Sequence, residues 1–64
     1  VDPKIKELLE AEINDFINEV ERNNKTEEFK GKISFLQNMN IDELTNEKIN
    51  KSRKSIQTWL KEIE

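Results

Sequence analysis

Apolar residues recur every three or four positions in three stretches of the chain, and polar residues fill the positions between them. That spacing is typical of amphipathic helices. It predicts three helices, at about 3–22, 26–38 and 46–63. A single glycine and a single proline are too few for the many turns of an all-β fold. The pattern therefore predicts an all-α fold, a small antiparallel three-helix bundle that forms one domain over residues 1–64.

The first expected helix has clear ends and a wide apolar face. Asp2 is suited to cap it, and Pro3 occupies the first turn, where proline is tolerated. Asn23 and Asn24 accept a left-handed conformation and are expected to end it. The wide face is typical of a helix that packs against two neighbours. Its members are Ile5, Leu8, Leu9, Ile13, Phe16, Ile17 and Val20.

The other two expected helices have shorter core stripes. Thr26 is the expected N-cap of the second helix, and Thr45 that of the third. Gly31 lies away from the core face of the second helix and weakens it by about 1 kcal/mol relative to alanine. The expected core residues of these helices are Phe29, Ile33 and Leu36, followed by Ile49, Ile56, Leu60 and Ile63.

Composition narrows the chemistry that this chain can support. It has 64 residues, of which 33% are hydrophobic and 39% charged, with no cysteine and no histidine. Disulfides and zinc sites built on those ligands are excluded, and no serine has a histidine to activate it. A glycine-rich phosphate loop is also missing. We therefore expect no enzyme activity, no cofactor and no metal site.

Hydropathy bears on location. No apolar run approaches the roughly 20 residues that span a bilayer, and the first residues lack the apolar stretch of a secretory signal. These features predict no membrane association and a cytoplasmic location. The same features fit a structural fragment of a larger protein.

Glu12 is an unusual residue in the first apolar face, where it lies between Leu8 and Phe16 at helical spacing. A buried carboxylate without a partner is costly. Either it reaches solvent at a seam or pairs with Arg53 or Lys32 across the bundle, or it faces a basic residue of a partner protein. Both interpretations are open from the sequence.

Three large side chains, Phe35, Met39 and Trp59, lie at the edges of the core stripes. Aromatic residues and methionine are enriched at protein interfaces. They are candidate contact residues, together with Glu12, although they could equally complete a small core. The leading hypothesis is a small non-catalytic interaction or regulatory module that binds another protein or a second copy of itself.

Charge is distributed unevenly along the chain. Residues 1–22 carry seven acids and three bases, whereas residues 46–64 carry five bases and three acids, and the net charge is −3. Basic side chains on a helix can contact nucleic-acid phosphates. Glu47 and Glu62 share the basic face, which is also typical of ordinary solvation. The candidate phosphate contacts are Lys48, Lys51, Arg53, Lys54 and Lys61.

The segment Ser52–Leu60 resembles the recognition helix of helix-turn-helix proteins, and Leu44–Ile49 resembles the start of the helix that precedes it. The resemblance covers about a third of the chain and implies a small DNA-binding regulator as an alternative function. The usual turn between those two helices is missing, because Ile49 continues to Ser52 at helical spacing. We therefore expect one continuous helix.

Overall fold

Three α-helices and one short 3₁₀ helix form the part of the chain that the computed structural model describes, residues 2–63. Residues 1 and 64, the ends of the predicted domain, lie outside the described residues. The elements are α1 (Pro3–Arg22), α2 (Lys30–Asn38), η1 (Ile41–Glu43) and α3 (Asn46–Ile63). Residues 2–63 contain no strand. The predicted all-helical, three-helix fold is confirmed.

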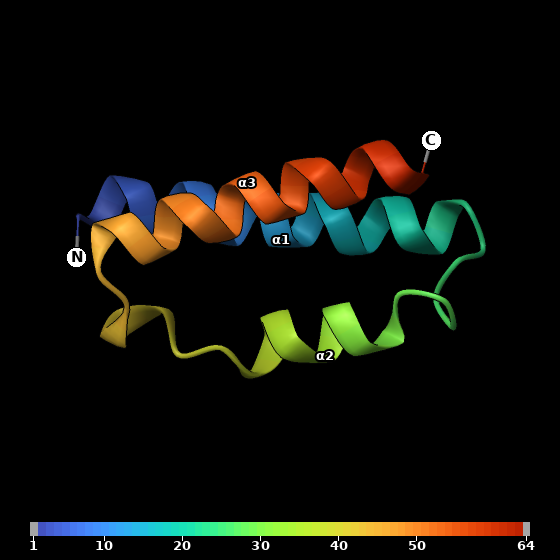
Figure 1. Ribbon diagram of the computed structural model, residues 1–64, viewed down its shortest axis with the longest axis horizontal. Coiled ribbons are helices and arrows are strands. Elements are labelled where there is room, and N and C mark those ends of the chain that lie inside the picture. Colours follow the sequence, from blue (N-terminus) through green and yellow to red (C-terminus); the bar gives the residue numbers. More distant parts are fainter. Residues whose placement is uncertain (1, 64) are drawn as a thin grey trace.

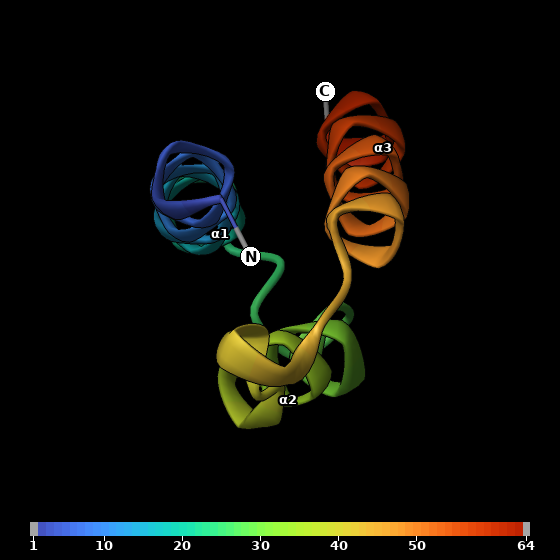
Figure 2. The same ribbon diagram turned by 90° about the vertical axis from the view of Figure 1, so that its left-hand side faces the viewer.

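The helices lie at the corners of a triangle when the molecule is viewed along its length (Figure 2). In Figure 1, α1 and α3 run in the same direction and α2 returns in the opposite one. The backbones of α1 and α3 approach each other most extensively. The molecule measures 33 × 19 × 15 Å.

Helix α1 begins and ends as its sequence predicts. Asp2 Oδ1 accepts a hydrogen bond from the Lys4 backbone amide at 2.9 Å. At the other end Asn24 is left-handed, with φ 56°. The Lys25 amide then donates to the Val20 carbonyl at 2.9 Å, which closes the last turn.

Helix α2 begins at Lys30, so the prediction of a start near residue 26 is wrong. Residues 26–29 form a turn, in which the Phe29 amide donates to the Lys25 carbonyl at 3.0 Å. Phe29 itself is the N-cap residue, and no side chain caps the helix. The chain reverses directly after α1, and the turn brings the Phe29 ring into the core before the axis of α2 begins.

Helix α3 has the side-chain cap that α2 lacks. Thr45 Oγ1 accepts a hydrogen bond from the Lys48 amide at 3.2 Å, as its position predicts. The helix then continues unbroken from Asn46 to Ile63, so the expected continuity across Ile49 and Ser52 is confirmed.

The core is a single apolar cluster to which all three helices contribute. Leu8 lies outside it, with 48% of its surface exposed, although the sequence places it in the core face. The face of α1 is wider than its two neighbours can cover, and Leu8 occupies the uncovered edge. The buried residues are Leu9, Ile13, Phe16, Val20, Phe29, Leu36, Ile49, Ile56 and Ile63.

Candidate functional site

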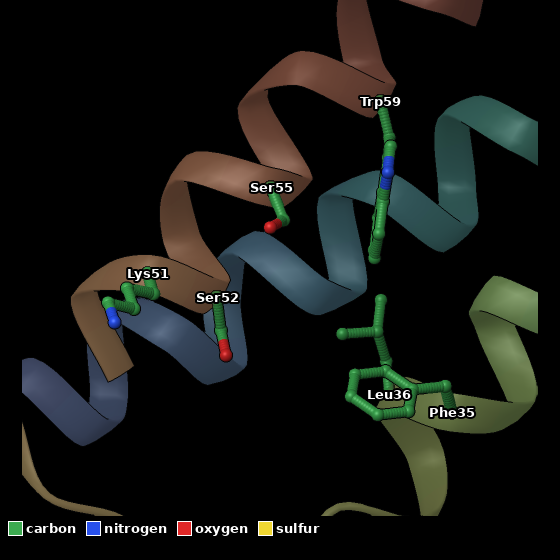
Figure 3. A pocket seen from close by; sticks show the side chains of 6 residues that line it. All are labelled: Phe35, Leu36, Lys51, Ser52, Ser55 and Trp59. Atoms are coloured by element: carbon green, nitrogen blue, oxygen red, sulfur yellow. The ribbon is translucent and has the colours of Figure 1, made fainter. Parts of the chain in front are cut away.

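An apolar groove of about 280 Å³ runs between α2 and α3. Figure 3 shows Trp59 pointing toward Leu36 across the groove, with Phe35 beside Leu36. Leu36 is buried and forms the floor, whereas Lys51 is the charged residue of the lining. The lining residues are Phe35 and Leu36 from α2, and Lys51, Ser52, Ser55 and Trp59 from α3.

Phe35, which lines this groove, is the most exposed large hydrophobic side chain among residues 2–63. It has 61% of its surface accessible to solvent, in a domain whose other phenylalanines, Phe16 and Phe29, are buried. Removing an aromatic ring from water is strongly favourable, so an exposed ring beside an apolar groove marks a surface that gains from being covered.

Trp59 belongs partly to the core and partly to the groove. Its ring lies 5.7 Å from the Phe16 ring, which in turn meets Phe29 edge to face at 5.8 Å. Lys32 Nζ lies 5.0 Å from the centre of the Phe29 ring and 5.6 Å from that of Trp59. Trp59 therefore packs against the Phe16 ring and the Lys32 ammonium group, and it also forms one wall of the groove.

Met39 lies next to the groove. The Ser52 hydroxyl donates to Met39 Sδ at 3.9 Å, and both residues are half-buried. The structure therefore brings the three contact candidates Phe35, Met39 and Trp59 to one side of the bundle. Ser55, which also lines the groove, was not among the residues that apolar periodicity singled out, because a small exposed serine carries no such signal.

Glu12 belongs to α1 and contacts the side of α3 that faces away from the groove. Arg53 Nε donates to Glu12 Oε1 at 2.9 Å, and the side chains are only 27% and 22% exposed, respectively. This is one of the two pairings that the sequence leaves open. Glu12 Oε2 is buried and has no hydrogen-bond partner among residues 2–63. The carboxylate therefore depends on Arg53 to offset its burial.

The basic residues of α3 point in several directions. Lys48, Lys51, Lys54 and Lys61 are exposed, whereas Arg53 is half-buried beside Glu12. Lys51 Nζ lies 3.9 Å from Glu47 Oε1 one turn away. Two of the five candidate phosphate contacts thus have an acidic partner within the chain, which weakens the positive field of the helix.

A third electrostatic contact joins α1 to the connection after α2. Lys6 Nζ bonds to Asp42 Oδ1 in η1. The hydrogen bond to Asp42, together with its negative charge, raises the pKa of Lys6 above its ordinary value. This contact holds η1 against α1, on the side of the bundle away from the groove.

Other kinds of site find no support in the described part of the chain. Residues 2–63 contain no group of three acidic residues placed to hold a metal ion. Within the same range, no helix combines the length and apolar character needed to cross a membrane. Comparisons with protein-family models, with curated proteins and with solved structures give no match to this chain.

Proposed function

We propose that this chain is a small non-catalytic interaction module that binds protein through the groove between α2 and α3. The observation that carries the proposal is the exposed ring of Phe35 beside an apolar groove. Interfaces are built around such aromatic anchors and the pockets next to them. A regulatory role follows if the partner's activity changes when the groove is occupied, and the cytoplasmic location stays a prediction.

Nucleic-acid binding remains the alternative function. It would use the exposed lysines of α3, Lys48, Lys54 and Lys61. Lys54 and Lys61 share one side of the helix, within about 20°, whereas Lys48 lies about 120° from Lys54 at 100° per residue. The groove has one cation in its lining and is otherwise largely apolar, which suits a protein partner better than a phosphate backbone.

Site-specific photo-cross-linking tests the proposal. The photoreactive residue p-benzoylphenylalanine would replace Phe35 in one variant and Gln57 in a control. Gln57 is exposed on α3 but does not line the groove. After irradiation in the cells that make the chain, we expect a protein adduct of one defined mass at position 35 only. Equal adducts at both positions, or no protein adduct at position 35, would contradict the proposal.

Purified components then separate the two functions. Binding of the protein identified in the adduct should change little as salt rises from about 50 to about 200 mM, whereas nucleic-acid binding falls by orders of magnitude over that range. We expect Phe35→Ala to weaken protein binding at least tenfold, as loss of an interface anchor does. Salt-sensitive binding of DNA that Phe35→Ala leaves unchanged would favour the alternative.

A further inference from the structure

One flank of α3 carries a second, polar stripe beside the buried one. Its members are spaced four, three, four and three residues apart, which is the spacing of a seam between two packed helices. The middle three line the groove, and the outer two are exposed charged residues of opposite sign. The stripe consists of Lys48, Ser52, Ser55, Trp59 and Glu62.

The charges of this stripe are symmetric about Ser55. Lys48 precedes Ser55 by seven residues and Glu62 follows it by seven. Two turns of helix place each charge roughly 10 Å from Ser55 along the axis and within about 20° of its direction. Among residues 2–63, neither Lys48 nor Glu62 has an ion-pair partner.

A two-fold axis through Ser55 would pair these charges. If a second α3 crossed the first in the opposite direction at Ser55, Lys48 would face the partner's Glu62. The symmetry repeats that contact, so one crossing yields two attractive pairs. Ser52 and Ser55 are small, and small residues at a crossing let two helices approach closely.

The same arrangement would cover the exposed ring of the groove. Phe35 lines the groove with Ser55, so the two copies of Phe35 would meet beside the axis and enter the apolar space between the molecules. A standard interface buries roughly 800 Å² on each partner, about a sixth of this chain's surface of 4613 Å². The groove lies on the face formed by α2 and α3, one of the three long faces of the triangular bundle (Figure 2).

We propose that the groove is closed by a second copy of this chain, in a two-fold dimer whose α3 helices cross antiparallel at Ser55. This proposal rests on the proposed function and names its partner. The paired charges set the register, and the two Phe35 rings supply the apolar burial.

Charge exchange at Lys48 and Glu62 tests the dimer by sedimentation equilibrium of the whole chain. The parent chain should change from monomer to dimer as its concentration rises. Lys48→Glu or Glu62→Lys alone should each raise the dissociation constant about tenfold, because either change places like charges together twice. Lys54→Glu is the matched control: it has the same charge change on another side of α3 and should leave the constant within about threefold.

Two further experiments, a double variant and a mixture of the single variants, make the test specific to the pairing of Lys48 with Glu62. The double variant Lys48→Glu with Glu62→Lys restores both attractive pairs and should dimerise about as well as the parent. An equal mixture of the two single variants should form a heterodimer more tightly than either variant forms a homodimer, since both of its charge pairs are attractive. Circular dichroism of each variant confirms that it is folded.

Several outcomes would overturn the dimer. They are a parent that stays monomeric at every concentration, single variants that dimerise like the parent, or a double variant that stays as weak as the singles. Photo-cross-linking at position 35 separates this failure from that of the proposed function. An adduct with a different protein would refute the second copy and leave the interaction module standing, whereas the absence of any protein adduct would refute both.

Discussion

The two flanks of α3 differ in how completely the chain covers them. Toward α1 the backbones approach closely, and Arg53 and Glu12 form a half-buried ion pair. Toward α2 the helix borders an open groove, and Phe35 stays 61% exposed. The two neighbours also differ in length, because α2 has 9 residues and α3 has 18, about 14 Å against about 27 Å. The groove lies alongside α2 and not beyond its ends, because Phe35 and Leu36 of α2 line it together with residues of α3.

The largest effect on the free energy of unfolding should come from removing the ring of Phe16, which packs at the centre of the core. Phe16 is fully buried and contacts the rings of Phe29 and Trp59. Phe16→Ala should cost about 3–5 kcal/mol, which approaches the whole stability of a domain this small. Circular dichroism should show loss of the cooperative thermal transition. Leu8→Ala, at an exposed position, is the control and should cost about 0.5 kcal/mol or less. A melting temperature for Phe16→Ala close to that of the parent would contradict this account of the core.

A smaller effect on the free energy of unfolding should distinguish the flank of α3 toward α1, the closed flank, from the flank toward α2, the open flank. Arg53→Met leaves the carboxylate of Glu12 without its partner and should cost about 2 kcal/mol in urea denaturation. Lys51→Met, which removes an exposed pair with Glu47 at 3.9 Å, should cost about 0.5 kcal/mol or less. Combining Arg53→Met with Glu12→Leu should recover most of the loss. Equal costs for the Arg53 and Lys51 changes would show that the two flanks do not differ electrostatically.

A substitution in α2, the helix that borders the open flank, should raise the stability of the domain. An added Cβ at Gly31 meets nothing within 4 Å, and the residue has no positive φ. Gly31→Ala should therefore raise stability by about 0.5–1 kcal/mol through helix propensity. The reverse change at an exposed site of α1, Ala11→Gly, should lower it by a similar amount. Urea denaturation and slower amide exchange in α2 would measure the gain, and a loss of stability would mean that α2 needs the flexibility of glycine.

The smallest effect concerns the third side of the bundle, where Asp42 raises the pKa of Lys6 above its ordinary value of 10.5. A raised folded-state pKa means that the contact stabilises fully below the unfolded-state value and is lost as pH rises through the higher folded value. The parent should therefore be slightly more stable than Lys6→Gln at pH 7–9, and the difference should shrink in strongly alkaline solution. Urea denaturation over that pH range measures it. A difference that grows with pH would contradict the assignment.

Periodicity predicted most of the fold because each helix carries its own evidence. The caps at Asp2 and Thr45 and the left-handed Asn24 are local chemistry, so they could be inferred without knowing the packing. The start of α2 could not be inferred this way. Thr26 has the right side chain for a cap, but the requirement to bury Phe29 is tertiary and decides where the helix begins.

The groove was only partly predictable. Periodicity places Phe35 and Trp59 at the edges of the apolar stripes of their helices. Whether those two edges lie side by side depends on how α2 packs against α3, which periodicity does not determine. The pair of Glu12 with Arg53 was one of the options that helical angle allowed. The spacing of Lys48, Ser55 and Glu62 is written in the sequence, yet it has meaning only once the groove beside it is known to be open.

The shared direction of α1 and α3 has a mechanical consequence (Figure 1). The start of α1 and the end of α3 lie at opposite ends of a body 33 Å long. Tension applied between those two points would slide α1 along α3, loading their core contacts and the Arg53–Glu12 pair together in shear. Peeling the helices apart would instead break the contacts one after another. A domain with this topology resists stretching along its length better than it resists being opened from one end.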